Sequence, residues 1–262
     1  MEIRDFGSDE ADLLCVACGE PNLEFTQDTP SRLIKVRCRC VRERIHQIED
    51  SRRKIRVNQL RHDGGLDVPM YTNMTFENDN GNNPCVANVC RNYVSNWQEM
   101  YKNGVGYIFV GPPSVGKTFF SGCILNALVE QEVSVFVTNF PKLLRIIKST
   151  KWGDDQHAIF NQIMTYDLML LDDLGVEYTS DFALEQLYSV IDARCQSCKP
   201  FMVTTNIDLE DMTSPKLDVA RERIYSRILN KCIPIVVEGE SQRIINGREM
   251  FSKYEDLLGL DF

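Results

Sequence analysis

The sequence predicts an α/β fold built on a mostly parallel sheet of about five strands. Three observations lead to this prediction. Apolar runs with the composition of strands alternate along the chain with segments of helical periodicity. A glycine-rich loop, residues 111–118, connects one of these strands to a helix. A later run, residues 168–171, is apolar at every position, as expected of a strand buried on both faces of a parallel sheet.

The loop reads G-P-P-S-V-G-K-T and matches the phosphate-binding pattern G-x-x-x-x-G-K-[ST]. Its glycines allow the backbone to wrap closely around a phosphate, so that main-chain N–H groups and the following helix N-terminus point at the anion. Lys117 would reach the β- and γ-phosphates, and the Thr118 hydroxyl would ligate Mg²⁺. A glycine–proline turn with a surface lysine is the alternative, but it leaves the flanking strand and helix unexplained. The residues predicted to contact the nucleotide are Gly111, Pro112, Pro113, Ser114, Val115, Gly116, Lys117, Thr118 and Phe119.

The rest of the alternation surrounds this loop. Strands are predicted from apolar, β-branched and aromatic residues at 107–110, 133–138, 168–173, 201–206 and 233–237. Helices are predicted at 118–131, at 139–165 in two pieces broken near 152–154, at 181–194 and at 217–229.

Two acidic residues, Asp172 and Asp173, directly follow the run at 168–171. A carboxylate at the carboxyl end of a parallel strand lies beside the phosphate loop. Asp172 can therefore hold Mg²⁺ through water, and Asp173 can orient or activate the attacking water. Asn206, at the end of the next strand, would bond the γ-phosphate or that water. A hairpin turn is the alternative interpretation of D-D-L-G, and the phosphate loop 55 residues upstream argues against it.

Four cysteines near the N-terminus have metal-ligand spacing. The pairs Cys15-x-x-Cys18 and Cys38-x-Cys40 are separated by 19 residues. Two close thiolate pairs can complete a tetrahedral S₄ shell around Zn²⁺ and leave no open position for catalysis. A segment of about 45 residues cannot bury enough apolar surface to fold unaided, so a metal would stabilise it. His46 is a possible substitute ligand, and free buried thiols are the alternative to a metal site.

The other six cysteines fall mostly in helical or strand patterns and are predicted to be small core residues. They are Cys85, Cys90, Cys123, Cys195, Cys198 and Cys232. Disulfides are not expected in a chain without an export signal. The C-x-x-C at 195–198 resembles a redox pair, but it lies at the end of a predicted helix without a partner motif. We therefore favour inert thiols there.

The composition is that of an ordinary globular protein, with 43% hydrophobic and 26% charged residues in 262. Its apolar runs fall short of the roughly 18 residues that a membrane span needs, so no membrane partner is expected. Residues 1–5, M-E-I-R-D, lack the pattern of a secretory signal, which makes the cytoplasm the expected location.

The net charge of −9 argues against a protein that coats nucleic acid over its whole surface. Residues 41–61 depart from this balance. They carry seven Lys or Arg and three acidic residues, a net +4 that leaves −13 for the remainder. Such asymmetry is typical of an interaction segment, although a solvated helix face is the simpler explanation.

In order, the segments G-P-P-S-V-G-K-T, L-M-L-L-D-D-L-G-V-E, K-P-F-M-V-T-T-N, R-E-R-I-Y-S-R-I and E-S-Q-R resemble the DnaC/DnaI family of replicative helicase loaders. These are AAA+ ATPases related to the IstB transposition helpers. The resemblance covers residues from about 69 to 250. The N-terminal cysteines and the basic segment resemble the zinc-bearing, helicase-binding end of DnaI-type loaders, and a phage-encoded loader fits equally well.

The resemblance implies an AAA+ P-loop NTPase fold preceded by a small zinc-binding module. Its implied parts are a helicase-interaction module at 1–45, a basic helical linker at 46–68 and an AAA+ ATPase domain at 69–262. The implied cofactors are ATP, Mg²⁺ and Zn²⁺. In this arrangement the loop at 111–118 is Walker A, and Asp172 with Asp173 is Walker B.

Further roles follow from the same resemblance. Asn206, with Thr205 beside it, falls at sensor I. Arg227 falls at the arginine finger, which points at nucleotide held by a neighbouring subunit, and Arg243 matches the sensor II arginine, which touches phosphate in cis. Residues 74–77 resemble a segment that helps to enclose the adenine. Arg227 and its neighbour Arg223 have an alternative role as ordinary salt-bridging helix residues.

Two positions depart from the family pattern. Ser114 stands where many members have glycine, and Asp173 replaces the glutamate that is common among AAA+ enzymes. The missing methylene at position 173 sets the carboxylate back, so the sequence predicts slow hydrolysis.

Together with the motifs, the resemblance implies an ATP-dependent loader that self-associates through its AAA+ domains and places the hexameric replicative helicase on single-stranded DNA. A track for the DNA backbone is predicted at Lys142, Arg145, Lys148 and Lys151, for which a solvated helix face is the alternative. Two other functions remain open: an IstB-type ATPase that assists a transposase, and an adaptor that binds ATP as a structural clamp.

Overall fold

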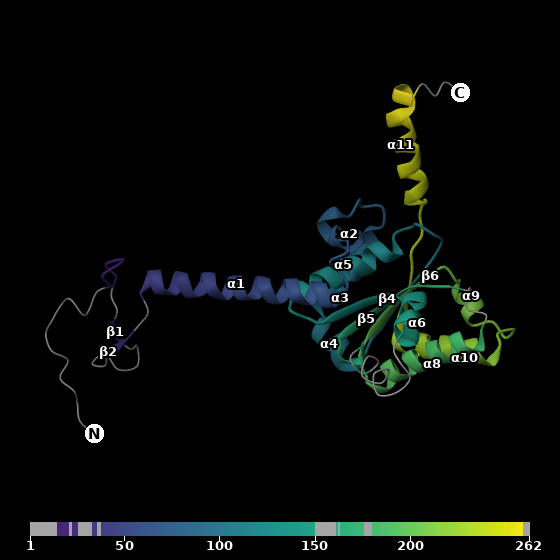
Figure 1. The fold of residues 1–262 in the computed structure, drawn as a ribbon, viewed down its shortest axis with the longest axis horizontal. Helices are drawn as coiled ribbons and strands as arrows, with labels where there is room; N and C mark the ends of the chain where they lie inside the picture. The colour runs from purple at the N-terminus through teal and green to yellow at the C-terminus, as the bar shows by residue number, and fades with distance from the viewer. Residues whose placement is uncertain are drawn as a thin grey trace. The chain divides into compact units, whose positions relative to one another are not determined.

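The computed structural model describes residues 15–20, 23–25, 33–35, 38–149, 161, 163–175 and 180–258. The chain divides into two compact units, Met1–Arg56 and Val57–Phe262. The second unit contains a sheet and the helices that cover it (Figure 1). The first unit contains the cysteine pairs. None of the helices in the described part of the chain combines the length and the apolar character needed to cross a membrane.

The sheet of the second unit has five strands in the order β4-β5-β6-β3-β7, and every neighbouring pair is parallel. The strands are β3 (Gly106–Val110), β4 (Val135–Asn139), β5 (Leu168–Leu174), β6 (Phe201–Thr205) and β7 (Cys232–Val236). This confirms the predicted five-stranded parallel sheet. Pro234 lies in β7, which among the described strands pairs with β3 alone and so forms an edge of the sheet. The missing N–H of proline therefore leaves no gap inside the sheet.

Alternate residues of the central strands face two separate cores, which explains their continuous hydrophobicity. In β5, Leu168 and Leu170 belong to one core, and Met169 and Leu171 belong to the other. The first core is shared with helices α3 (Pro84–Ser95), α4 (Trp97–Asn103) and α5 (Lys117–Glu130). The second is shared with α6 (Phe140–Ser149), α8 (Asp181–Gln196) and α10 (Val219–Lys231). The unit is therefore a sheet between two helical layers (Figure 1).

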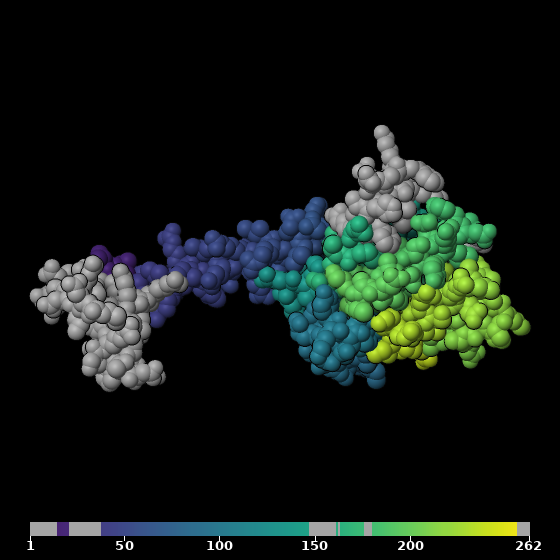
Figure 2. Space-filling view, turned by 90° about the horizontal axis from the view of Figure 1, so that it is seen from below, coloured from purple at the N-terminus to yellow at the C-terminus, as the bar shows by residue number. Residues whose placement is uncertain are grey.

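The second helical layer is formed by segments far apart in the sequence. Figure 2 shows the green of α8 beside the yellow-green of α10. The predicted helical stretch at 139–165 begins as α6, and residues 161 and 163–165 are again helical. Its predicted break near 152–154 lies outside the described residues. The unit also contains three short elements: α2 (Pro69–Thr72), a 3₁₀ turn (Phe76–Asn78) and α9 (Leu209–Met212). A longer helix, α11 (Gln242–Leu258), follows β7.

In the first unit, β1 (Leu23–Phe25) pairs antiparallel with β2 (Leu33–Lys35), which gives a short hairpin between the two cysteine pairs. Helix α1 (Arg39–Asp63) begins beside the second pair and contains the basic segment 41–61. Most of its side chains as far as Arg56 are exposed. The division between the two units falls within this helix, after Arg56.

Candidate functional site

A cavity of about 630 Å³ lies at the carboxyl ends of the parallel strands. Its volume is in the range of small-molecule sites. The loop after β3 supplies residues 113–118 to its wall, and the end of β5 supplies Asp172 and Asp173. Met70, Tyr71 and Met74 line another side. The cavity thus combines a polar end that suits phosphates with an apolar side that suits a base.

The loop after β3 has the backbone that its glycines predict. Gly111 has φ +152° and Gly116 has φ +108°, both in the region that favours glycine. A Cβ at Gly111 would also lie 2.2 Å from the carbonyl oxygen of Val237. Gly116 directly precedes α5, so the free N–H groups of that helix open into the cavity.

Ser114 lies in the same loop with φ +66°, a left-handed conformation that costs a non-glycine residue about 1–2 kcal/mol. Its carbonyl accepts a hydrogen bond from the backbone of Gln242 at 2.9 Å, which glycine would preserve. The departure from the family pattern therefore leaves the loop shape intact and stores strain in it.

Replacing Ser114 with glycine should relieve this strain and raise the free energy of unfolding by about 0.5–1 kcal/mol, after the entropy that glycine adds to the unfolded chain. Denaturant midpoints of the two proteins measure the difference. Ser197, with φ −71°, is the matched control, and its replacement by glycine is expected to reduce stability. Equal losses at both serines would contradict a strained Ser114.

Lys117 lies inside the loop with 7% of its surface exposed. Its ammonium donates to the carbonyl oxygens of Gly111 (2.7 Å) and Pro112 (2.6 Å) and to the side-chain oxygen of Asn206 (2.7 Å). Burial lowers the pKa of Lys117, and the carboxylates of Asp173 and Asp172 act in the opposite direction. Three acceptors use all three ammonium donors, so a phosphate could bind Lys117 by exchanging with these oxygens.

Asp172 and Thr118 lie together, as the sequence predicts for a magnesium site. The Thr118 hydroxyl donates to Oδ1 of Asp172 at 2.9 Å, and the Thr204 hydroxyl donates to the same oxygen at 2.6 Å. The Tyr71 hydroxyl lies 3.4 Å from Oδ2. Burial and the Asp172 charge raise the pKa of Tyr71, so it remains a hydrogen-bond donor. A carboxylate and a hydroxyl beside a phosphate cradle are the hard oxygen ligands that Mg²⁺ takes, so these residues fit the ion.

Asp173 has φ +57° and lies at a bulge, where the β5–β6 register shifts between Leu171 and Leu174. Its backbone N–H donates to the Thr204 hydroxyl at 2.8 Å, and its carboxylate lies 3.5 Å from the Asn206 amide. Aspartate and asparagine adopt left-handed backbone more readily than other non-glycine residues. The bulge therefore gives a physical reason for aspartate, rather than glutamate, at this position.

The polar end of β6 differs from the prediction in one residue. Thr205 does not line the cavity, because its hydroxyl donates to the carbonyl oxygen of Leu174 at 2.5 Å on the other side of the strand. Thr204 and Asn206 face the cavity instead. Successive strand residues point to opposite faces, so residues 204 and 206 share a face and residue 205 does not. This alternation is the sequence signal that could have identified Thr204 as the partner of Asn206.

The segment before the core is held against α5 by Asn126, a buried residue that the sequence analysis did not single out. Its amide donates to the carbonyl oxygens of Tyr71 and Met74, each at 2.9 Å. Its side-chain oxygen accepts from Arg61, which also pairs with Glu130 at 2.8 Å. This clamp fixes the apolar side of the cavity where Met74 was predicted to enclose a base.

The two predicted arginine positions and the four predicted DNA-track positions differ in their placement. Arg243, at the start of α11, lines the cavity, as does Phe119. Arg227 does not line it and pairs with Asp192 of α8. Lys142 and Arg145 are exposed on α6. The side chain of Lys148 and the whole of Lys151 lie outside the described residues.

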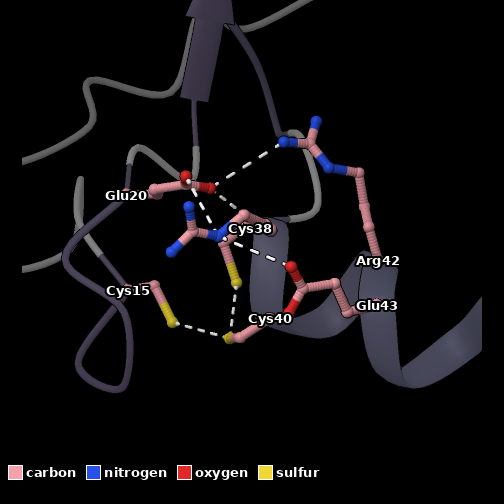
Figure 3. A network of polar contacts seen from close by, with 7 residues as sticks. Cys15, Glu20, Cys38, Cys40, Arg42 and Glu43 are labelled. Atoms are coloured by element: carbon pink, nitrogen blue, oxygen red, sulfur yellow. Dashed lines mark hydrogen bonds and ion pairs between the residues drawn. The ribbon is translucent and has the colours of Figure 1, made fainter.

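The four N-terminal cysteines form a second candidate site. Figure 3 shows three of them, Cys15, Cys38 and Cys40. The sulfur atoms of Cys15, Cys18, Cys38 and Cys40 all lie within 4.8 Å of one another. Cys40 lies 3.5 Å from Cys15 and 3.2 Å from Cys38, sulfur to sulfur. A tetrahedral S₄ shell around zinc requires sulfur separations of about 3.8 Å, so this donor set fits Zn²⁺.

The surroundings of the cysteine cluster support this interpretation. Backbone N–H groups of Cys18 and Ala17, together with neighbouring thiols, lower the pKa of Cys15 to about 6, which favours the thiolate. His46 is not part of the cluster. Its Nε2 lies 3.5 Å from Oδ2 of Asp50, one helical turn further along α1. Glu20 accepts from the backbone N–H of Arg39 at 2.8 Å and so caps the helix that carries Cys40 (Figure 3).

The remaining six cysteines are free thiols, as are the four in the cluster. Cys90, Cys123 and Cys232 are buried, and burial raises the pKa of each thiol, so they are the expected core residues. Cys85 and Cys198 are exposed, which corrects the prediction for these two.

The parallel sheet, the phosphate loop and the paired Asp172 and Thr118 define an ATP-binding P-loop protein of AAA+ architecture. The chain belongs to the family of IstB-like ATP binding proteins, which its residues 93–250 match. It is similar to the replicative helicase loader DnaC of Escherichia coli (strain K12), with 26% identity over 188 residues, which span 69% of this chain and 74% of that protein.

It is also 26% identical to the replicative helicase loader DnaI of Bacillus subtilis (strain 168) over 149 residues, which span 53% of this chain and 48% of DnaI. Among solved structures, the crystal structure of the DnaC helicase loader matches 65% of this chain and 100% of its own, with a TM-score of 0.58 and 23% identity. These comparisons confirm the resemblance noted in the sequence. The match to the solved structure shows that the two chains share a fold.

Proposed function

We propose that this protein is an ATP-dependent loader that places the hexameric replicative DNA helicase on single-stranded DNA in the bacterial cytoplasm. The observation that carries the proposal is the combination of an ATP-type cavity with a four-cysteine cluster at the start of the long helix α1. The relatives named as replicative helicase loaders support it.

In this proposal, main-chain N–H groups of the loop and the Lys117 ammonium bind the β- and γ-phosphates of ATP. Thr118 and Asp172 would hold Mg²⁺, which neutralises charge on the phosphate oxygens. Asp173 orients the attacking water and accepts its proton, and Asn206 donates to that water or to the γ-phosphate. Arg243 contacts phosphate from the start of α11.

The assembled state follows from the same roles. Copies of the chain stand side by side, so that Arg227 of one copy serves the nucleotide of the next. Zinc would be held by Cys15, Cys18, Cys38 and Cys40 and would fold the module that binds the helicase. Lys142 and Arg145, exposed on α6, contribute to a backbone track for single-stranded DNA whose affinity falls with salt.

The decisive experiment is co-elution with a purified replicative helicase hexamer in the presence of ATP and magnesium. Co-elution of the full chain, and its loss when residues 1–56 are deleted, is the expected result, because this deletion removes the cysteine cluster and leaves the second unit whole. Failure to bind any bacterial helicase ring would overturn the loader proposal.

A role in transposition is the second candidate, because the matched family is named for IstB. Such a helper would bind duplex DNA and a recombinase. Binding of labelled duplex in preference to single strands, without any helicase binding, would favour it. An adaptor that uses ATP only as a clamp is the third candidate, and the variant of Asp173 described next distinguishes it.

Replacing Asp173 with asparagine should lower ATP turnover about 100-fold, because the water loses its charged acceptor. Asparagine tolerates the left-handed backbone of this position, so ATP binding and stability should remain within about twofold and 0.5 kcal/mol of the parent. Steady-state phosphate release and equilibrium binding measure the two effects. Asp211, an acidic residue of α9 outside the cavity, is the matched control. Unchanged turnover in Asp173→Asn would support the clamp.

A further inference from the structure

Arg227, on α10, is held by two side chains of α8 that lie one helical turn apart. Its Nε donates to Oδ1 of Asp192 at 2.6 Å. Its guanidinium lies over the ring of Tyr188, with 4.5 Å between the guanidinium carbon and the ring centroid. Tyr188 and Asp192 are at positions i and i+4, so they share one face of α8. We call these two residues the arginine socket.

The socket uses one side of the guanidinium only. A structural arginine–carboxylate pair is frequently bidentate and engages the terminal nitrogens. Here the bond to Asp192 engages Nε, and no polar group in the described part of the chain contacts the two terminal nitrogens of Arg227. Arg227 also lines a surface hollow of about 380 Å³ together with Lys231, Ser226 and Asn230. The terminal N–H groups are thus available to a molecule outside this chain.

The socket is itself fixed in place. The second oxygen of Asp192, Oδ2, accepts from the amide of Gln196 at 2.7 Å, so both carboxylate oxygens are bonded. Arg194, two residues after Asp192, is fully buried and donates to the carbonyl oxygens of Tyr166 (2.9 Å) and Asp167 (3.2 Å). These bonds attach this turn of α8 to the start of β5. The orientation of Arg227 is therefore set before any partner binds.

We propose that Asp192 and Tyr188 are positioning residues that hold Arg227 with its terminal N–H groups directed at the phosphates of ATP bound to a neighbouring copy of the chain. The inference rests on the proposed function, in which Arg227 acts on the neighbour's nucleotide. A flexible arginine loses conformational entropy when it engages a phosphate, and a socket that orders it in advance reduces that loss. The guanidinium fork needs a defined plane to meet phosphate oxygens, which stacking on Tyr188 provides.

The first test is ATP turnover at concentrations where the chain assembles. Replacing Arg227 with alanine is expected to lower turnover at least about 100-fold, and replacing Asp192 with alanine about 10-fold. In the Arg227→Ala background the Asp192 replacement should add nothing, since its target is absent. Glu185→Ala, which removes an exposed acidic residue of the same helix, is the matched control and should have no effect. Tyr188→Phe retains the ring face and should stay within about twofold, whereas Tyr188→Leu should not.

The second test is complementation between two variants. An unfolded variant could not regain turnover in a mixture, so this test distinguishes a misplaced arginine from a loss of fold. Lys117→Ala copies lack ATP binding but retain an intact Arg227 and socket. Mixing them with Asp192→Ala copies should restore turnover above that of either variant alone, because the correctly held arginine then comes from the other copy. If Asp192→Ala fails to fold, Tyr188→Leu, which removes the ring under the guanidinium and keeps the Asp192 bond, replaces it in both tests.

The outcomes separate the two levels of the proposal. Unchanged turnover in Arg227→Ala would remove the arginine's assigned role and with it that part of the proposed function. A large loss in Arg227→Ala together with unchanged turnover in Asp192→Ala would overturn the socket alone. Increased turnover in Asp192→Ala would also overturn it, because Asp192 would then withhold Arg227 rather than position it.

Discussion

Replacing Lys117 with alanine is expected to weaken ATP binding at least about 100-fold and to abolish measurable turnover. A hydrogen bond to a charged group contributes about 1.5–3 kcal/mol, and this ammonium would make more than one to the β- and γ-phosphates. The Lys117 side chain is only 7% exposed, so a cation from bulk solvent does not readily replace the ammonium that alanine removes. Calorimetric titration with ATP and magnesium, and phosphate release, measure the two effects.

The structure also predicts what this variant leaves intact. Lys117 bonds two carbonyl oxygens of the loop, at Gly111 and Pro112, and Lys117 itself lines the cavity, so water from the cavity can enter the space that alanine leaves. The melting temperature without nucleotide should therefore change little. Lys102→Ala, at an exposed lysine of α4, is the matched control and should bind ATP as the parent does. Parent-like ATP affinity in Lys117→Ala would show that the nucleotide binds elsewhere.

The central strands were predictable because a parallel strand buried on both faces leaves a distinct pattern. In β5 every residue from 168 to 172 is buried. A helix that buries one face would show polar residues within such a run, so the unbroken apolar run at 168–171 indicates a strand buried on both faces. The edge strand β7 was also found, although Ile233 and Val236 are exposed, because its composition is that of a strand. Helices α3 and α11 were missed. Helix α3 has asparagine, cysteine and valine at many positions, which are weak helix formers, and packing against α5 stabilises it.

The site shows the same division between local and long-range information. The phosphate loop and the aspartate pair lie in motifs, and parallel strands bring their carboxyl ends together, so Thr118 and Asp172 could be paired from the sequence. Tyr71 and Asn126 could not. Tyr71 reaches Asp172 across 101 residues, and Asn126 reaches Tyr71 across 55. Such contacts follow from the way a segment before the core folds over α5, and no local pattern encodes it.

Replacing Cys38 with serine is expected to remove zinc from the protein and to unfold the module that contains the cysteine cluster. Four thiolates close the shell, and structural zinc in small modules contributes about 10–16 kcal/mol of apparent binding free energy that is also folding free energy. Zinc content, measured by elemental analysis of the purified protein, should fall from about one ion per chain to a small fraction of that. Treatment of the parent with a strong chelator should have the same effect on the circular dichroism of the module.

The Cys38 variant should retain ATP binding, because the cavity is formed wholly by residues of the second unit. It should lose co-elution with the helicase hexamer, since the proposed binding module is no longer folded. Cys198→Ser is the matched control: this thiol is exposed and lies outside the cluster, so zinc content and helicase binding should be those of the parent. Full zinc content in Cys38→Ser would show that Cys38 is not a zinc ligand, and absence of zinc from the parent would show that the four sulfurs gather without a metal. Loss of zinc with retained helicase binding would instead show that the helicase binds outside the cysteine module, on helix α1 or on the second unit.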